Sequence, residues 1–184
     1  MNDTYIGQEF KTYQNCIAKV IENADFKNIL IEFQDDYKFR RLVRLDHLRN
    51  GQIKNPYFPS IFGIGYIGEE YSNKNISKDR AYNIWIKILE RCYNDKFKIK
   101  NPSYEECEVC KEWHNYSNFK KWYYNNIYYV PNEMMQIDKD IIKKGNKIYC
   151  PEYCVLVPQA INCLFVKNNA LRGECVIGVT RRKN

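Results

Sequence analysis

Apolar and polar residues alternate in short runs over the first third of the chain. Residues 16–22 and 28–34 are runs rich in β-branched side chains with a turn-like segment between them, and residues 38–45 alternate basic and apolar side chains. A period of two is typical of strands with one buried face. The pattern predicts three strands that form a small β-barrel or sheet, although residues 41–48 also fit a short helix.

The pattern changes to a helical period between residues 77 and 94. Apolar positions recur three and four residues apart and form one stripe, which predicts an amphipathic helix capped by Ser77 or Asp79. A second helix, rich in aromatic residues, is predicted to have Ser117 as its cap. The stripe of the first helix consists of Ala81, Ile84, Trp85, Ile88, Leu89 and Cys92.

Residues 134–162 read as a strand, a loop with lysines and glycine, a second strand and a helix. For the whole chain we therefore predict an α+β fold. It has a small β-rich domain over residues 1–66, a linker over 67–78, a ββα domain with flanking helices over 79–166, and a basic tail with one strand over 167–184.

Oxygen-bearing side chains gather in the predicted ββα segment. Asp138 and Asp140 stand two residues apart on the predicted strand, so their side chains are expected on one face. Asn146 follows a glycine in a predicted tight turn, and Glu152 begins the second half of the segment. Such oxygens suit Mg²⁺, which neutralises the leaving group in phosphodiester hydrolysis. The alternative is an ordinary β-hairpin whose acidic side chains are solvated.

Positive charge is concentrated outside the predicted β-rich domain. Residues 1–66 carry 9 lysines and arginines against 8 acidic residues, whereas residues 67–184 carry 20 against 14, within a net charge of +7. A basic region favours a polyanion partner, DNA above all; the alternative is a basic surface with no partner. The candidate phosphate-binding residues are Lys139, Lys143, Lys144, Lys147, Arg181 and Arg182.

Two closely spaced cysteine pairs suggest a metal site. Two residues separate Cys107 from Cys110, and three separate Cys150 from Cys154. Four thiolates in a tetrahedron would hold a structural Zn²⁺, with His114 as a substitute ligand. The alternative is four small buried side chains.

The first ten residues lack a basic region followed by an apolar run, and no window approaches the ~20 apolar residues of a membrane span. We therefore expect a cytoplasmic protein with reduced thiols and no membrane partner.

Several short motifs occur together over residues 79–162. They are Tyr82-x-x-Trp85, ERCYN at 90–94, Cys110-x-x-Trp113, FKKW at 119–122, and IDKDI followed by KGNKIYCPEYCVLVP over 137–158. This string resembles a bacteriophage-borne family related to HNH, or His-Me finger, homing endonucleases. The resemblance implies a ββα-metal fold with Asp138, Asn146 and Glu152 at matching positions. The tail motif IGVTRR resembles the first strand of the Apetala-type DNA-binding domain that follows in many relatives.

Two positions depart from the family pattern. In active relatives a histidine beside the first aspartate is the general base, and Lys139 stands in its place. Tyr153 stands where relatives often have a metal-proximal asparagine. A protonated lysine cannot accept a proton from water. The resemblance therefore implies a nucleic-acid-binding protein with a degenerate nuclease domain and weak or no phosphodiesterase activity. If it cuts, Asp138 and Asp140 would hold the metal, with Asn146 or Glu152 in support.

A function of a different class is also open. A phage protein with a decayed nuclease fold can be recruited to inhibit a host defence nuclease, such as a CRISPR effector, by direct protein contact. DNA binding should weaken steeply with salt, whereas a protein complex that rests on apolar contacts should survive it. A purely structural accessory protein would show neither behaviour.

Overall fold

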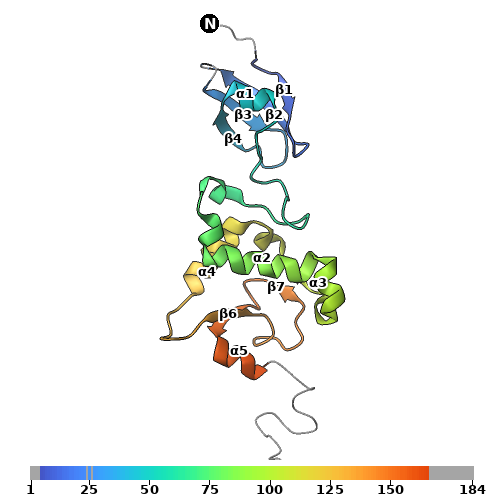
Figure 1. Ribbon diagram of the computed structural model, residues 1–184, viewed down its shortest axis with the longest axis vertical. Coiled ribbons are helices and arrows are strands. Elements are labelled where there is room, and N and C mark those ends of the chain that lie inside the picture. Colours follow the sequence, from blue (N-terminus) through green and yellow to red (C-terminus); the bar gives the residue numbers. More distant parts are fainter. Residues whose placement is uncertain (1–4, 24, 26, 166–184) are drawn as a thin grey trace, which may run out of the picture.

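The computed structural model describes residues 5–165 apart from residues 24 and 26. Within this part the chain is a mixed α+β protein, as predicted. Its long axis runs from an N-terminal sheet, through a group of helices, to a C-terminal helix (Figure 1). Two separate groups of buried apolar side chains lie along this axis. We call them the sheet core and the helical core, and their members are given below.

An antiparallel sheet forms the N-terminal part. Its strands are β1 (Glu9–Lys11), β2 (Ile17–Asn23), β3 (Ile29–Phe33) and β4 (Arg40–Val43), paired in that order. The last three confirm the predicted strands. β1 and β4 stay unpaired on their outer sides within the described residues, so the prediction of a barrel or sheet resolves to an open sheet.

β3 shows why this region folds as a sheet. Ile29, Ile31 and Phe33 alternate with partly exposed residues and are fully buried, and β-branched side chains pack well on such a half-buried surface. The short helix α1 (Leu45–Arg49) covers the same face. The sheet core consists of Ala18, Val20, Ile29, Ile31, Phe33, Val43, Leu45, Leu48 and Ile53.

A connecting segment, residues 54–79, leads from the sheet to α2 (Arg80–Tyr93) through two 3-10 helices, η1 (Gly68–Ser72) and η2 (Ile76–Lys78). Its close approach to α2 depends on Gly65. A Cβ atom at that position would lie 2.5 Å from a methyl carbon of Leu89, so glycine is the residue that fits without displacing the helix.

α2 is the predicted amphipathic helix. Asp79 is its N-cap: the carboxylate accepts a hydrogen bond from the Ala81 amide at 2.9 Å. Trp85 is fully buried, and its indole N–H donates to the Trp113 carbonyl at 2.6 Å. The shorter helix α3 (Asp95–Lys100) follows.

The second predicted helix is α4 (Tyr116–Asn126). Its N-cap is Asn115, whose side-chain oxygen accepts from the Ser117 amide at 2.9 Å. The prediction of Ser117 as the cap is therefore wrong. Its hydroxyl instead donates to the carbonyl of Ile67 in the connecting segment, also at 2.9 Å. The remaining 3-10 turns are η3 (Pro102–Tyr104) and η4 (Lys111–His114).

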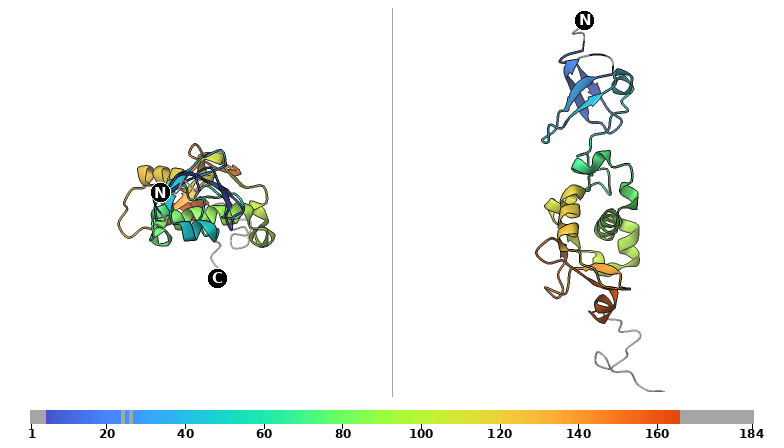
Figure 2. Two further views of the ribbon diagram at one scale, coloured as in Figure 1. Left: turned by 90° about the horizontal axis from the view of Figure 1, so that it is seen from above. Right: turned by 90° about the vertical axis from the view of Figure 1, so that its left-hand side faces the viewer.

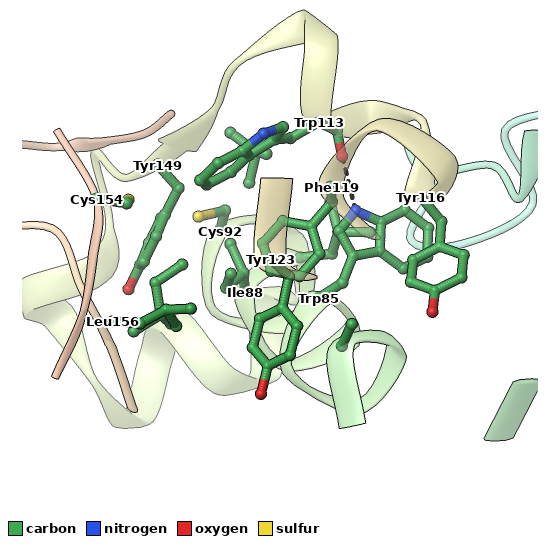
Figure 3. Packing of buried hydrophobic residues seen from close by; sticks show 14 of the residues in the cluster. Trp85, Ile88, Cys92, Trp113, Tyr116, Phe119, Tyr123, Tyr149, Cys154 and Leu156 are labelled. Carbon is green, nitrogen blue, oxygen red and sulfur yellow. Dashed lines mark hydrogen bonds between the residues drawn. The ribbon is translucent and has the colours of Figure 1, made fainter. Parts of the chain in front are cut away.

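Aromatic rings fill the helical core (Figure 3). Trp113 meets Phe119 edge to face with ring centroids 5.0 Å apart, and Tyr116 packs against Trp85 at 5.3 Å. Such arrangements stabilise beyond area burial alone. The buried members of the helical core are Ala81, Trp85, Ile88, Leu89, Cys92, Cys107, Val109, Trp113, Tyr116, Phe119, Tyr123, Met135, Ile137, Tyr149, Cys154 and Leu156.

Four short strands close the helical core. β6 (Met135–Asp138) pairs antiparallel with β8 (Val155–Pro158), and β5 (Glu108–Val109) pairs parallel with β7 (Ile148–Tyr149). The alternative of a hairpin between residues 137 and 150 is therefore wrong. The predicted order of strand, loop, strand and helix exists with β8 as the second strand, because α5 (Gln159–Phe165) follows it and contacts both β6 and β8.

Two further expectations concern the membrane and the tail. No helix in the described ranges is long and apolar enough to cross a lipid bilayer. The predicted tail strand, Cys175, Arg181 and Arg182 lie outside the described residues.

Candidate nucleic-acid interface

An open cleft of about 1360 Å³ lies between α2, the loop that follows β6, and α5. We call it the basic cleft, because seven cationic side chains line it against two acidic ones. The cations come from both walls, four from α2 and the residues around it and three from the loop. They are Lys78, Arg80, Lys87, Arg91, Lys139, Lys144 and Lys147; the acids are Asp138 and Asp140.

The helical wall was not among the predicted site residues. Arg80, Lys87 and Arg91 recur seven and four residues apart, so they share one face of α2 beside its apolar stripe. Two of them are held in place. Arg80 donates to the Met135 carbonyl at 2.8 Å, and the Arg91 guanidinium lies 5.7 Å from the Tyr104 ring. Sequence reasoning could have found this wall from the helical period of basic residues.

The loop wall depends on Lys139. Its ammonium nitrogen is buried and donates to the Asp140 carboxylate at 2.7 Å and to the Asn146 carbonyl at 2.5 Å. The same nitrogen lies 5.9 Å from the Tyr149 ring centroid. Lys139, predicted to contact phosphate, thus also has a structural role, because its ammonium group donates hydrogen bonds within the loop.

Asn146 completes this internal network. Its side-chain amide donates to the carbonyls of Lys139 and Ile148, at 3.0 and 2.7 Å, and its oxygen accepts from the Ile148 amide at 3.2 Å. The preceding Gly145 has a φ of +75°, as the predicted tight turn requires. The side-chain oxygen of Asn146, the atom that would bind a metal, thus already accepts one hydrogen bond from the Ile148 amide.

Both aspartates line the cleft, but they are not placed there by a shared strand face, as the sequence predicts. β6 ends at Asp138, so Asp140 is not on the strand and the shared-face argument does not apply. One Asp138 oxygen accepts from the amides of Asp140 and Ile141 at 2.7 and 2.8 Å and fixes the turn. Asp140 is exposed apart from its ion pair with Lys139. Each carboxylate keeps one oxygen that makes neither of these contacts.

Three other predicted residues sit at or beyond the edge. Lys147 lines the cleft but donates to the Ser103 carbonyl at 3.3 Å. Lys143 lies 5.0 Å from the Tyr153 ring, and neither Lys143 nor Glu152 belongs to the described lining. A hydrogen bond with the Cys150 thiol lowers the pKa of the exposed Glu152 carboxyl.

The predicted cysteine tetrad divides into two groups. Cys110, Cys150 and Cys154 interact electrostatically, and burial raises the pKa of Cys110 to about 11 and of Cys154 to about 12. Cys107 instead neighbours Cys92. Among the described residues no three His, Cys, Asp or Glu side chains form a group that could hold a metal ion. Structural zinc and catalytic magnesium stay predictions.

No model of a known protein family, no curated protein and no solved structure matches this chain. The likeness to His-Me finger nucleases therefore rests on the quoted motifs and stays a prediction. What the described residues offer directly is the charge and shape of the basic cleft.

Proposed function

We propose that this protein binds nucleic acid, with DNA as the first candidate, in the basic cleft. The observation that carries the proposal is the excess of seven cations over two acids in one concave site. Lys78, Lys87 and Lys144 are exposed there, and the described part of the chain gives their ammonium groups no partner. Such lysines exchange counterions for phosphates, which is the main source of sequence-independent affinity.

The rest of the lining suits a nucleic acid better than a small anion. Arg80 and Arg91 are already positioned by backbone and ring contacts, so less rotamer freedom is lost when they meet phosphates. Met134 and Leu164 also line the cleft, with 59% and 61% of their surface exposed. Apolar side chains beside phosphate contacts can pack against sugars and bases.

We further propose that hydrolysis is weak or absent. The residue in the general-base position of the resembling family is Lys139, and its nitrogen donates inward to a carboxylate and a carbonyl. A group engaged in this way offers no lone pair to an attacking water. Asp138 and Asp140 remain the side chains that would matter if a divalent metal supported residual cleavage.

Two charge-matched double variants test the binding site. Lys87→Glu with Lys144→Glu reverses both walls of the cleft, whereas Lys11→Glu with Lys111→Glu changes net charge equally at exposed positions outside it. Fluorescence anisotropy with a labelled DNA duplex should show at least about tenfold weaker binding for the first pair. The second pair should bind like wild type. Equal loss in both pairs would contradict a located site.

A cleavage assay separates binding from catalysis. Plasmid DNA with Mg²⁺ or Mn²⁺ should be shifted but not cut by wild-type protein. Cleavage that Asp138→Ala abolishes would contradict the proposed loss of activity and establish a working nuclease. Absence of any salt-sensitive shift would contradict nucleic-acid binding altogether, and an inhibitor that contacts a host nuclease would become the better hypothesis.

A further inference from the structure

The connecting segment joins the N-terminal sheet to the helices (Figure 2). A second basic cleft is lined by residues of this segment and of the sheet region. We call it the junction cleft; its volume is about 830 Å³. Its cations outnumber its single acid, Glu70, which is already paired with Lys120 at 2.7 Å. The cations are Lys27, Arg41, Arg44, Lys54 and Lys74. Arg44 pairs with Asp46 at 2.9 Å, and Lys27 interacts with the Asp25 carboxylate. Among the described residues the other three cations have no acidic partner.

Arg41 is the residue that the fold does not explain. It is opposite Ile31 in the ladder and two residues from Val43, so it occupies the core-facing side of β4 where its neighbours are buried and apolar. Its guanidinium lies 5.3 Å from the Tyr71 ring, and its buried Nε atom has no acceptor within the described residues. A cation at an apolar position contradicts the local pattern, which is expected at functional sites.

The two clefts are neighbours along the chain. Ile76 lines the junction cleft and Lys78 the basic cleft, and both belong to η2. In the first turn of α2, Tyr82 faces the former and Arg80 the latter. Residues of the same short segment, η2 and the first turn of α2, therefore border both clefts.

We propose that the junction cleft binds the phosphate backbone of the same nucleic-acid molecule that occupies the basic cleft. This inference rests on the proposed function and adds to it that the N-terminal sheet lengthens the binding footprint. Arg41, stacked on Tyr71, would meet a phosphate with a positioned guanidinium, and Lys54 and Lys74 would flank it.

Arg41→Leu tests the inference against a structural role. Leucine suits the apolar face and removes a buried donor that lacks an acceptor, so the melting temperature should not fall. Affinity for a duplex of about 30 base pairs should nevertheless fall about tenfold, because a charge-assisted phosphate contact is lost. Lys54→Glu with Lys74→Glu gives a second variant that does not touch the sheet core. For this variant the slope of log affinity against log salt concentration should decrease in magnitude by about two.

The outcomes separate this inference from the proposed function. Both variants could bind with wild-type affinity and salt slope while Lys87→Glu/Lys144→Glu binds weakly. That result would overturn the proposal for the junction cleft and leave the proposal for the basic cleft intact. No binding by wild-type protein would overturn both. If Arg41→Leu lowers the melting temperature, the lysine pair decides, with Lys11→Glu/Lys111→Glu as its charge-matched control.

Discussion

The sheet core and the helical core differ in what fills them. Aliphatic side chains and one phenylalanine make the sheet core, and none of its buried members can ionise. The helical core is dominated by aromatic rings, includes three buried cysteines, and borders the buried Lys139 and Asn146. The basic cleft is lined from the second region. Buried polar side chains that shape the basic cleft thus lie against the helical core, whereas the sheet core itself contains only apolar side chains. The predictions below test this difference.

The largest effect is expected from Trp85→Ala. The substitution leaves a large cavity and removes the donor to the Trp113 carbonyl. The free energy of unfolding should fall by about 5 kcal/mol, as measured by urea denaturation with far-UV circular dichroism. Trp122→Ala, the same change at a half-buried position, should cost clearly less. Equal losses would contradict the central place of Trp85 in the helical core.

A smaller loss is expected from Asn146→Ala. The change leaves the buried Lys139 carbonyl and the partly buried Ile148 carbonyl without their donor, so stability should fall by about 3 kcal/mol. Asn125→Ala, on the exposed side of α4, should change stability by no more than about 0.5 kcal/mol. A stable Asn146→Ala protein would show that the loop does not need this network.

The contrast between Ile31 and Asn146 also explains how far sequence reasoning reached. Regular alternation fixed the strand around Ile31, and the helical period fixed α2, because both signals are local. β7 has only two residues and pairs in parallel with β5, about 40 residues earlier. No local pattern encodes that pairing, so the alternative of a hairpin, in which the segments of β6 and β7 would pair with each other, was wrong.

The candidate site was predicted in part for the same reason. Asp138, Asp140, Lys139, Lys144 and Lys147 do line one cleft, although β6 ends at Asp138 and Asp140 lies in the turn that follows. The facing wall on α2 and the junction cleft were not predicted. Both arise when segments distant in sequence come together, and their residues individually look like ordinary surface charges.

The smallest expected effect is a loss of stability at high pH, which comes from buried thiols of the helical core. Burial raises the pKa of Cys92 and Cys154 to about 12 from an unfolded value of 9.0. Unfolded thiols therefore release protons that the folded protein retains, so their stabilisation is complete below the unfolded pKa and is lost as pH rises toward the folded one. Between about pH 8 and about pH 9.5 stability should fall by roughly 1.5 kcal/mol.

Tryptophan fluorescence can follow this loss selectively, since Trp85, Trp113 and Trp122 all belong to or pack against the helical core. The variant with Cys92→Ala and Cys154→Ala should show a smaller change over the same pH interval, even though its stability is lower throughout. A pH dependence identical to that of wild type would assign the effect to other groups.

The most direct test of the account is to locate bound DNA by photocrosslinking. Duplex DNA containing bromodeoxyuridine would be irradiated with the wild-type protein at low salt, and the crosslinked peptides identified by mass spectrometry. We expect crosslinks within residues 78–91 and 134–149, the two walls of the basic cleft, and their loss as salt is raised. Crosslinks confined to other surfaces, such as α4, would contradict the assignment of the basic cleft as the nucleic-acid site.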